Sequence, residues 1–166
     1  MRIGVLSDTH IPGRARALPG KIFGLFAGVD LILHAGDITI HDVLDELAAL
    51  APVHAVCGNM DPYELRYSIP RRQVVTAAGK RIGLIHGDGA AGSTKVRALS
   101  AFSDEEVDAV VFGHSHMPTC ERHGSILLFN PGSPTDRRFG LHLTAGIIHI
   151  TSDGGLEGEI CAVDDK

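Results

Sequence analysis

The sequence predicts an α/β (α+β) fold in which two mixed β-sheets pack as a β-sandwich, with helices on the outside. In the first half of the 166-residue chain, apolar runs alternate with stretches of helical periodicity, which favours a largely parallel, covered sheet. In the second half, glycine-rich turns separate further apolar runs, which is typical of antiparallel pairing. A chain of this length is ordinary for one domain, so we expect a single domain over residues 1–166.

The first half is expected to alternate strands and helices. Three short apolar runs predict buried strands, at residues 2–7, 29–35 and 52–57. Apolar residues recur at helical spacing between these strands, at residues 16–27 and 40–50. Pro19 and Gly20 indicate that the first of these helices starts there.

The second half begins with a predicted hairpin. Its two strands, at residues 72–76 and 80–85, flank an Ala-Ala-Gly turn. A helix over residues 93–102, capped by Ser93 or Thr94, and a buried strand over residues 107–112 follow. Three strand candidates close the chain, at residues 125–129, 141–150 and 156–163, and we expect them to form an antiparallel meander.

The composition of the chain limits its cellular compartment and the classes of its binding partners. The net charge of −5 argues against nucleic acid or an anionic membrane as the main partner. Three cysteines without a CxxC pair indicate a reducing compartment, so we expect a cytoplasmic protein. A polar residue at position 7 comes too early for a signal peptide, and no run of about 18 apolar residues predicts a membrane span.

Polar side chains stand at the carboxyl ends of the predicted core strands. These candidate metal ligands are Asp8, His10, Asp37, Asn59, His86, His114 and His116. Residues i and i+2 of an extended chain point the same way, so Asp8 and His10 are expected to converge on one ion. Glycines precede three of the ligands and permit close backbone approach, at positions 36, 58 and 113.

This ligand set is too large for one tetrahedral ion and predicts two divalent ions. Asp37 would bridge them, one ion being held by Asp8, His10 and His116 and the other by Asn59, His86 and His114. Nitrogen and oxygen donors without a thiolate suit Mn, Fe, Ni, Co or Zn. A pair of such ions about 3.5–4 Å apart is a known device for phosphoryl chemistry, since it lowers the pKa of a bridging water and clamps phosphate oxygens.

Each residue alone also has a simpler interpretation. Asp37 could cap a helix, Asn59 could occupy a turn, and His86 or His114 could be core histidines. Their joint placement at successive strand ends favours the metal site. Two features stay open: the NPGS stretch at residues 130–133 is either a turn or a loop beside the ions, and Arg137 and Arg138 are either phosphate contacts or solvated charges.

The motifs and their order resemble the calcineurin-like metallophosphoesterase superfamily: DTH (8–10), GD (36–37), GN (58–59), His86 and GHSH (113–116). With NPGS and the small size, the chain looks like the compact YfcE-like phosphodiesterase subfamily, which is related to Vps29. The resemblance implies a phosphodiesterase in which a metal-bridging hydroxide attacks phosphorus at a dinuclear centre. It makes Mn the first choice of metal and Asn59 and His86 the catalytic candidates among the ligands.

One departure from the superfamily concerns the leaving group. Many members have a histidine directly after the GN motif, whereas this chain has Met60, so no residue is predicted to protonate the leaving group. The expected partner is a small phosphodiester, and the subfamily resemblance also implies a homo-oligomer. The alternatives are a phosphomonoesterase or nucleotide hydrolase on the same site, and a non-catalytic binding scaffold like Vps29.

Overall fold

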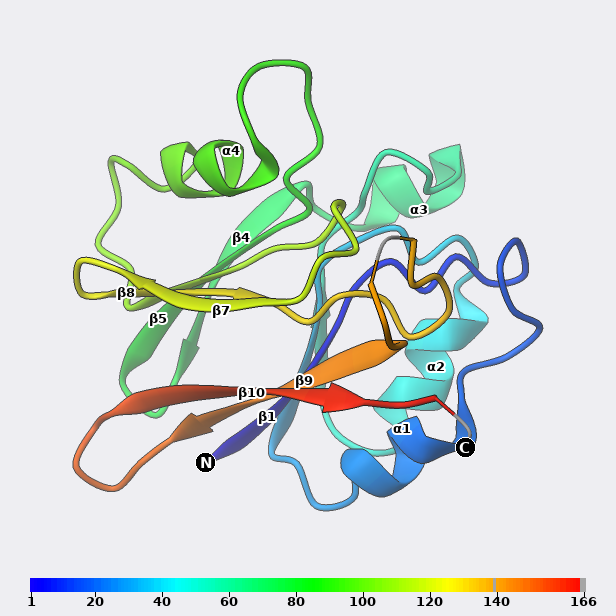
Figure 1. Cartoon of the computed structure of the whole chain (residues 1–166), viewed down its shortest axis with the longest axis horizontal. Coiled ribbons are helices and arrows are strands. Elements are labelled where there is room, and N and C mark those ends of the chain that lie inside the picture. Colours follow the sequence, from blue (N-terminus) through cyan, green and yellow to red (C-terminus); the bar gives the residue numbers. More distant parts are fainter. Residues whose placement is uncertain (139, 165–166) are drawn as a thin grey trace.

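The structure is a computed structural model that describes residues 1–138 and 140–164. Within these residues, two five-stranded mixed sheets lie face to face (Figure 1). The strands of the first sheet, in spatial order, are β10 (Leu156–Ala162), β9 (Thr144–Ile150), β1 (Arg2–Leu6), β2 (Leu31–His34) and β3 (Val53–Ala55). Those of the second sheet are β4 (Arg72–Ala77), β5 (Lys80–Ile85), β6 (Ala109–Val111), β8 (Ile126–Asn130) and β7 (Thr119–His123). The predicted fold class is confirmed.

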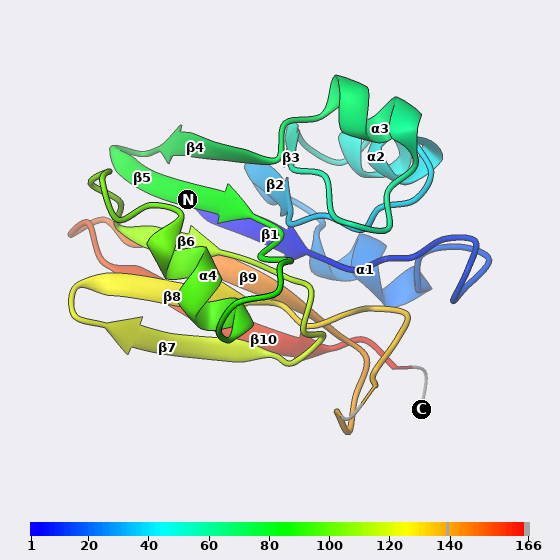
Figure 2. The ribbon, with the colours of Figure 1, turned by 90° about the horizontal axis from the view of Figure 1, so that it is seen from above.

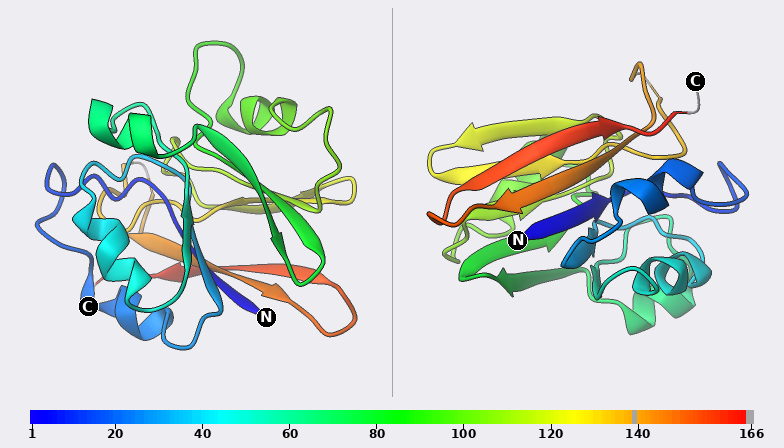
Figure 3. Two further views of the ribbon diagram at one scale, coloured as in Figure 1. Left: turned by 180° about the vertical axis from the view of Figure 1, so that it is seen from behind. Right: turned by 90° about the horizontal axis from the view of Figure 1, so that it is seen from below.

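Four short helices cover the outer faces of the sheets in the described part of the chain: α1 (Gly20–Leu25), α2 (Asp42–Ala48), α3 (Tyr63–Ser68) and α4 (Thr94–Ser100). Figure 2 shows α4 across the second sheet, and Figure 3 shows α1 and α2 on the far side of the molecule from α4. Ser93 caps α4 by accepting a hydrogen bond from the Val96 amide, as expected. None of the helices of the described residues is long and apolar enough to cross a membrane.

The alternation of side chains along the strands separates three apolar layers. Ile3 and Val5 of β1 point between the two sheets and join the central core, whereas Leu6 belongs to the outer core under α1 and α2. A third cluster, which includes Ala98 and Phe112, packs α4 onto the second sheet. The central strands β1, β2, β6 and β8 are therefore buried on two faces, which explains why they are continuous apolar runs rather than alternating ones.

Parallel pairing brings strand ends to one edge of each sheet. β1 pairs with β2, and β2 with β3, in parallel, so their carboxyl ends lie together. In the second sheet β5 and β6 are parallel as well. The loops that carry the candidate ligands all leave from these ends.

The expected antiparallel meander at the end of the chain is wrong. β8 enters the second sheet between β6 and β7, whereas β9 and β10 form a hairpin beside β1 in the first sheet. The physical reason is burial on both faces of β8: Leu127 and Phe129 fill the core between the sheets, and Leu128 packs beneath α4. A strand with two apolar faces needs an interior position.

Two elements have no counterpart in the sequence prediction. The edge strand β7 is exposed along most of its length, so its sequence TCERH lacks an apolar signal. The helix α3 has six residues and buries only Leu65, so it has no amphipathic pattern to detect.

Phe129 joins the two sheets, and its loss should destabilise the fold. The ring is fully buried, and a Cβ placed on Gly146 of the opposite sheet would lie 2.4 Å from it. We expect Phe129→Ala to lower the free energy of unfolding by about 3–5 kcal/mol, as measured by urea denaturation. Leu141→Ala, at a position that is 85% exposed, is the control and should change stability by less than about 0.5 kcal/mol. Equal urea midpoints for Phe129→Ala and the unaltered protein would contradict this packing.

Candidate metal centre

The loops after β1 and β2 are held together by their backbones. The Asp8 amide donates to the Gly36 carbonyl over 2.9 Å, and the His10 amide donates to the Asp37 carbonyl over 3.1 Å. On the second sheet, the Gly113 amide donates to the His86 carbonyl over 3.1 Å. The His114 amide then donates to Asp8 Oδ2 over 2.9 Å, which connects the two sheets at the centre.

Left-handed backbone conformations aim the ligands. Five of the candidates have φ between 45° and 65°: Asp8, His10, Asp37, His114 and His116. Asp8 and His10 converge as expected, but the extended chain is not the reason, since β1 ends at Leu6 and both residues have left-handed backbone conformations. Left-handed residues other than glycine cost about 1–3 kcal/mol each and persist only where the surroundings hold them.

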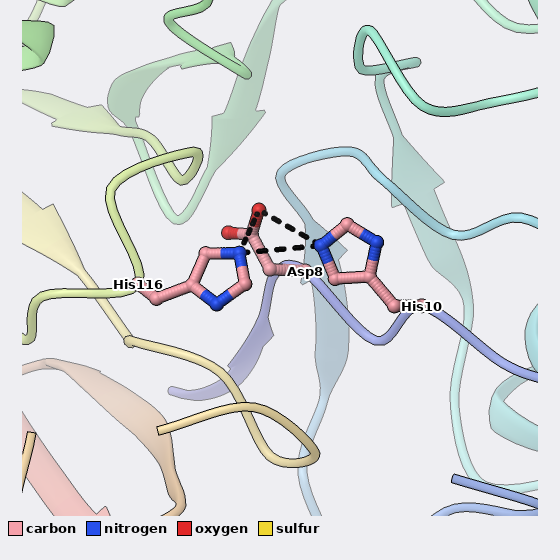
Figure 4. Close-up of side chains that lie close together, drawn as sticks. All are labelled: Asp8, His10 and His116. Atoms are coloured by element: carbon pink, nitrogen blue, oxygen red, sulfur yellow. Dashed lines mark hydrogen bonds and ion pairs between the residues drawn. The ribbon is translucent and has the colours of Figure 1, made fainter. Parts of the chain in front are cut away.

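The first group of ligands consists of Asp8, His10 and His116 (Figure 4). The Nε2 atoms of the two imidazoles lie 3.2 Å apart. Asp8 Oδ1 lies 3.7 Å from His10 Nε2 and 3.2 Å from His116 Nε2. Two nitrogens that each lie about 2.1 Å from one metal ion are separated by about 3.0–3.4 Å, so this spacing suits a shared ion.

The second group of ligands is centred on His86. Its Nε2 lies 3.2 Å from Asp37 Oδ2, and its ring lies edge-on to that of His114, with the centroids 5.1 Å apart. Asp37 Oδ2 is also 3.7 Å from His10 Nε2, and Asp8 Oδ1 is 4.0 Å from His86 Nε2. Both carboxylates therefore lie between the two pairs of histidines.

Two buried atoms of this cluster have no hydrogen-bond partner among the described residues, namely Asp8 Oδ1 and His86 Nε2. Buried polar atoms are rarely left unsatisfied, and both of these atoms point into the cluster. A divalent cation would satisfy them, and donors of nitrogen and oxygen without sulfur suit such an ion. The residues therefore fit the metal chemistry that their types predict.

Asn59 stands apart from the other candidates. Its side chain is exposed, whereas Asp8, His10, Asp37, His86 and His116 are buried and His114 is half-buried. The loop itself is close, because the Met60 amide donates to Asp37 Oδ1 over 2.8 Å. The structure thus gathers six of the seven candidates and leaves Asn59 exposed at the surface, in a part of the chain that it fully describes.

Backbone carbonyls orient the buried imidazoles. His86 Nδ1 donates to the Ala35 carbonyl over 2.8 Å, and His116 Nδ1 donates to the Asp136 carbonyl over 3.0 Å. These bonds direct each Nε2 toward the carboxylates, the arrangement that metal-binding histidines commonly have.

Asp61 is a supporting residue that the sequence analysis missed. Its buried carboxylate accepts hydrogen bonds from the amides of Asp37, Thr39 and Gly58, and so ties the loops after β2 and β3 together. An Asp before Pro62 is typical of a helix N-terminus, but here the carboxylate makes no cap to α3. The available signal therefore pointed to a helix start rather than to the site.

The NPGS stretch is a loop beside the centre, which decides the alternative that the sequence left open. Ser133 Oγ donates to the Asp8 carbonyl over 2.7 Å, and Asn130 Nδ2 donates to the Gly113 carbonyl over 2.9 Å. Further along, Arg137 pairs with Asp164 over 3.6 Å. Arg138 instead lines a cavity of about 530 Å³ beside His10.

The pKa shifts in the cluster show that its buried carboxylates favour positive charge beside them. Burial opposes ionisation of Asp8, but the adjacent imidazoles of His10 and His116 and the charge of His86 hold its pKa well below the usual range. The pKa of Asp37 is also lowered, because contact with His86 outweighs burial. Burial lowers the pKa of His86, yet the two carboxylates outweigh it and raise that pKa to about 9. The pKa of His114 is lowered by burial and by the neighbouring His86.

Comparisons with known proteins agree with this geometry. Residues 1–153 match the calcineurin-like phosphoesterase superfamily domain. The chain is 39% identical to a probable metallophosphoesterase of Methanocaldococcus jannaschii over 168 aligned residues, which cover 99% of this chain and 83% of the relative. The fold and these relatives identify the class of protein as a metallophosphoesterase. The chain belongs to the calcineurin-like phosphoesterase superfamily.

Solved structures share the fold. A Vps29 variant from Entamoeba histolytica has a TM-score of 0.78 at 22% identity, covering 99% of this chain and 100% of that one. An archaeal phosphodiesterase has a TM-score of 0.73 at 24% identity, covering 97% of this chain and 100% of that one. These neighbours confirm the sandwich with flanking helices.

Gly113 leaves no room for a side chain beside Asp8. A Cβ there would lie 1.7 Å from Ser7 Oγ and 2.7 Å from Asp8 Oδ2. We expect Gly113→Ala to displace Asp8 and weaken Mn²⁺ binding by about 10–100-fold in calorimetry, while urea denaturation reports whether the protein is folded. Gly24→Ala is the matched control, because nothing lies within 4 Å of a Cβ at that position. Wild-type affinity in a folded Gly113→Ala protein would show that the close approach is unimportant.

Metal binding should release a proton from His86. Its pKa in the metal-free fold, about 9, lies above the ordinary histidine value of 6.5, so the proton is retained at neutral pH and lost only as the pH rises through about 9. An ion at Nε2 must displace that proton. At a pH of about 7.5, Mn²⁺ should release about one more proton from the wild type than from His86→Gln, and the difference should vanish above a pH of about 10.

Calorimetry in buffers of different ionisation enthalpy measures this release. Equal proton release by the wild type and His86→Gln at neutral pH would contradict the charge state assigned to His86.

Proposed function

We propose that the chain is a metal-dependent phosphodiesterase with a dinuclear centre. The observation that carries the proposal is the arrangement of four imidazoles in two pairs, His10 with His116 and His86 with His114, around two buried carboxylates. One ion needs only one such group. Two groups that share carboxylates are what a pair of ions requires.

The ligands divide as the motifs predict. Asp8, His10 and His116 would hold one ion, and His86, His114 and Asn59 the other. Asp37 would bridge them, because its Oδ2 faces both His10 and His86. Mn is the ion we propose, with Ni, Fe, Co and Zn as chemically similar substitutes. Two divalent ions supply an activated water and stabilise the charge that develops on the phosphate.

The protein's own groups prepare this chemistry. Asp8 and Asp37 stay ionised without neutralising two divalent ions, so the centre keeps a positive charge that attracts an anionic phosphate. The backbone bonds of His86 and His116 fix their rings before substrate arrives. Asn59, exposed at the surface, is free to donate its amide to a phosphate oxygen.

The residue after the GN motif, Met60, cannot protonate the leaving group. The Met60 side chain is 59% exposed, and a thioether has no proton to give. We therefore expect solvent to protonate the leaving group and the enzyme to favour leaving groups of low pKa. The same metal chemistry would serve a phosphomonoesterase. The experiment must therefore compare the hydrolysis of monoesters and diesters.

The second candidate function is a non-catalytic binding scaffold, because Vps29 is among the structural neighbours. The presence of all seven candidate ligands in this chain favours catalysis over that alternative. Turnover distinguishes the two, since a scaffold without chemistry would leave every ester intact.

Loss of either half of the centre should remove activity. Asp37→Ala and His114→Ala should each lower turnover of bis-p-nitrophenyl phosphate with Mn²⁺ by more than about 100-fold and reduce the bound metal. His142→Gln is the control, because this exposed histidine pairs with Asp164 away from the centre. The diester should be hydrolysed faster than p-nitrophenyl phosphate at equal metal loading. Full turnover by either alanine variant, or none by the wild type with any of the five metals, would overturn the proposal.

A further inference from the structure

A cavity lies directly beside the candidate centre. Its volume is about 530 Å³, which is in the range of small-molecule sites. Its lining comes from the loops after β1, β2 and β3 and from the loop before β9: His10, Pro12, Gly13, Arg14, Thr39, Met60 and Arg138. His10 belongs both to the cavity and to the first group of ligands. A molecule in the cavity would therefore touch the centre.

Two arginines from distant parts of the chain meet at this cavity around one carboxylate. Arg14 Nε lies 3.2 Å from Asp136 Oδ2, and Arg138 Nε lies 3.9 Å from the same oxygen. The carboxylate is largely buried, whereas the side chains of Arg14 and Arg138 are 61% and 39% exposed. One carboxylate cannot neutralise two guanidinium groups, so the cavity wall keeps a positive charge.

The contacts of the arginines leave donors for a ligand. Arg138 Nη1 donates to the His114 carbonyl over 3.2 Å, which anchors this side chain next to the centre. Arg14 contacts Asp136 through Nε, and within the described residues neither of its Nη atoms has a hydrogen-bond partner. A guanidinium presents its donors in a planar fork that matches a carboxylate or a phosphate.

The rest of the lining is mainly apolar. Pro12 and the exposed Met60 side chain offer hydrocarbon and thioether surface, and Thr39 adds a hydroxyl that already donates to a backbone carbonyl. A thioether adapts to flat, polarisable groups such as aromatic rings. The lining of the cavity thus combines apolar and cationic side chains.

We propose that this cavity binds one ester group of the substrate, and that this group is a small, apolar or aromatic moiety bearing a second anion, either phosphate or carboxylate. The inference rests on the proposed phosphodiesterase function and narrows its substrate class. Arg14 and Arg138 hold the second anion, Met60 and Pro12 contact the organic part, and the scissile phosphate lies at the centre beside His10.

The test compares diesters that share one leaving group. The p-nitrophenyl diesters whose second ester is phenyl, 4-carboxyphenyl or 4-phosphonophenyl differ only in the distal charge. We expect the wild type to prefer the charged esters over the phenyl ester by at least about tenfold in kcat/KM, mainly through KM. Arg14→Gln and Arg138→Gln should each reduce that ratio by about fivefold or more. The better of the two charged esters identifies the anion.

Arg137→Gln is the matched control, because it removes an adjacent arginine that pairs with Asp164 instead of lining the cavity. It should keep the wild-type ratio. A ratio near one in the wild type, or an unchanged ratio in both Arg14→Gln and Arg138→Gln, would overturn the assignment.

A binding measurement separates this inference from the proposed function. In metal-free protein, 4-carboxyphenylphosphonate should shift the NMR signal of the Met60 methyl group, assigned with Met60→Leu, and the shift should be lost in the Arg14→Gln/Arg138→Gln double variant. If no ester is hydrolysed but this shift occurs, the phosphodiesterase proposal fails and the anion site stands. If hydrolysis proceeds and the shift is absent or equal in the double variant, the anion site fails and the phosphodiesterase proposal stands.

Discussion

Two carboxylates, Asp8 and Asp37, are buried side by side where β1 and β2 end, and this burial is the constraint on which the site depends. An unpaired buried anion costs several kcal/mol, so the fold must place positive charge between and around them. His86 and His116, from loops of the second sheet, and His10 lie directly against these carboxylates. In the metal-free protein the proton on His86 supplies part of the charge, and a divalent cation would supply more.

The surrounding loops are built to keep the carboxylates in place. Asp61 ties the backbone at Asp37, Thr39 and Gly58, while Ser133 holds the carbonyl of Asp8. These bonds help to explain how so many left-handed residues persist in one place, since each would otherwise relax to a less strained conformation. Rigid support of this kind lets a site meet a transition state without reorganisation.

The sequence predicted most of the fold and the ligand types, because buried strands are apolar runs and a polar residue at the end of such a run is conspicuous. The prediction failed where the cause is not local. The interior place of β8 depends on what packs on both its faces, and the convergence of Asp8 and His10 depends on left-handed backbone conformations that no periodicity reveals. Asp61 and Arg14 act through residues distant in the chain, so their contacts with Asp37 and Asp136 follow only from the folded arrangement.

The central claim is that two ions share Asp37 and divide the histidines between them, with Asp8 on the ion of His10 and His116. Anomalous X-ray diffraction from crystals soaked in Mn²⁺, recorded at the manganese absorption edge, tests it directly. The account predicts two peaks about 3.5–4 Å apart, one bound by His10 and His116 and the other by His86 and His114. A single peak, or His114 and His116 on the same ion, would contradict it.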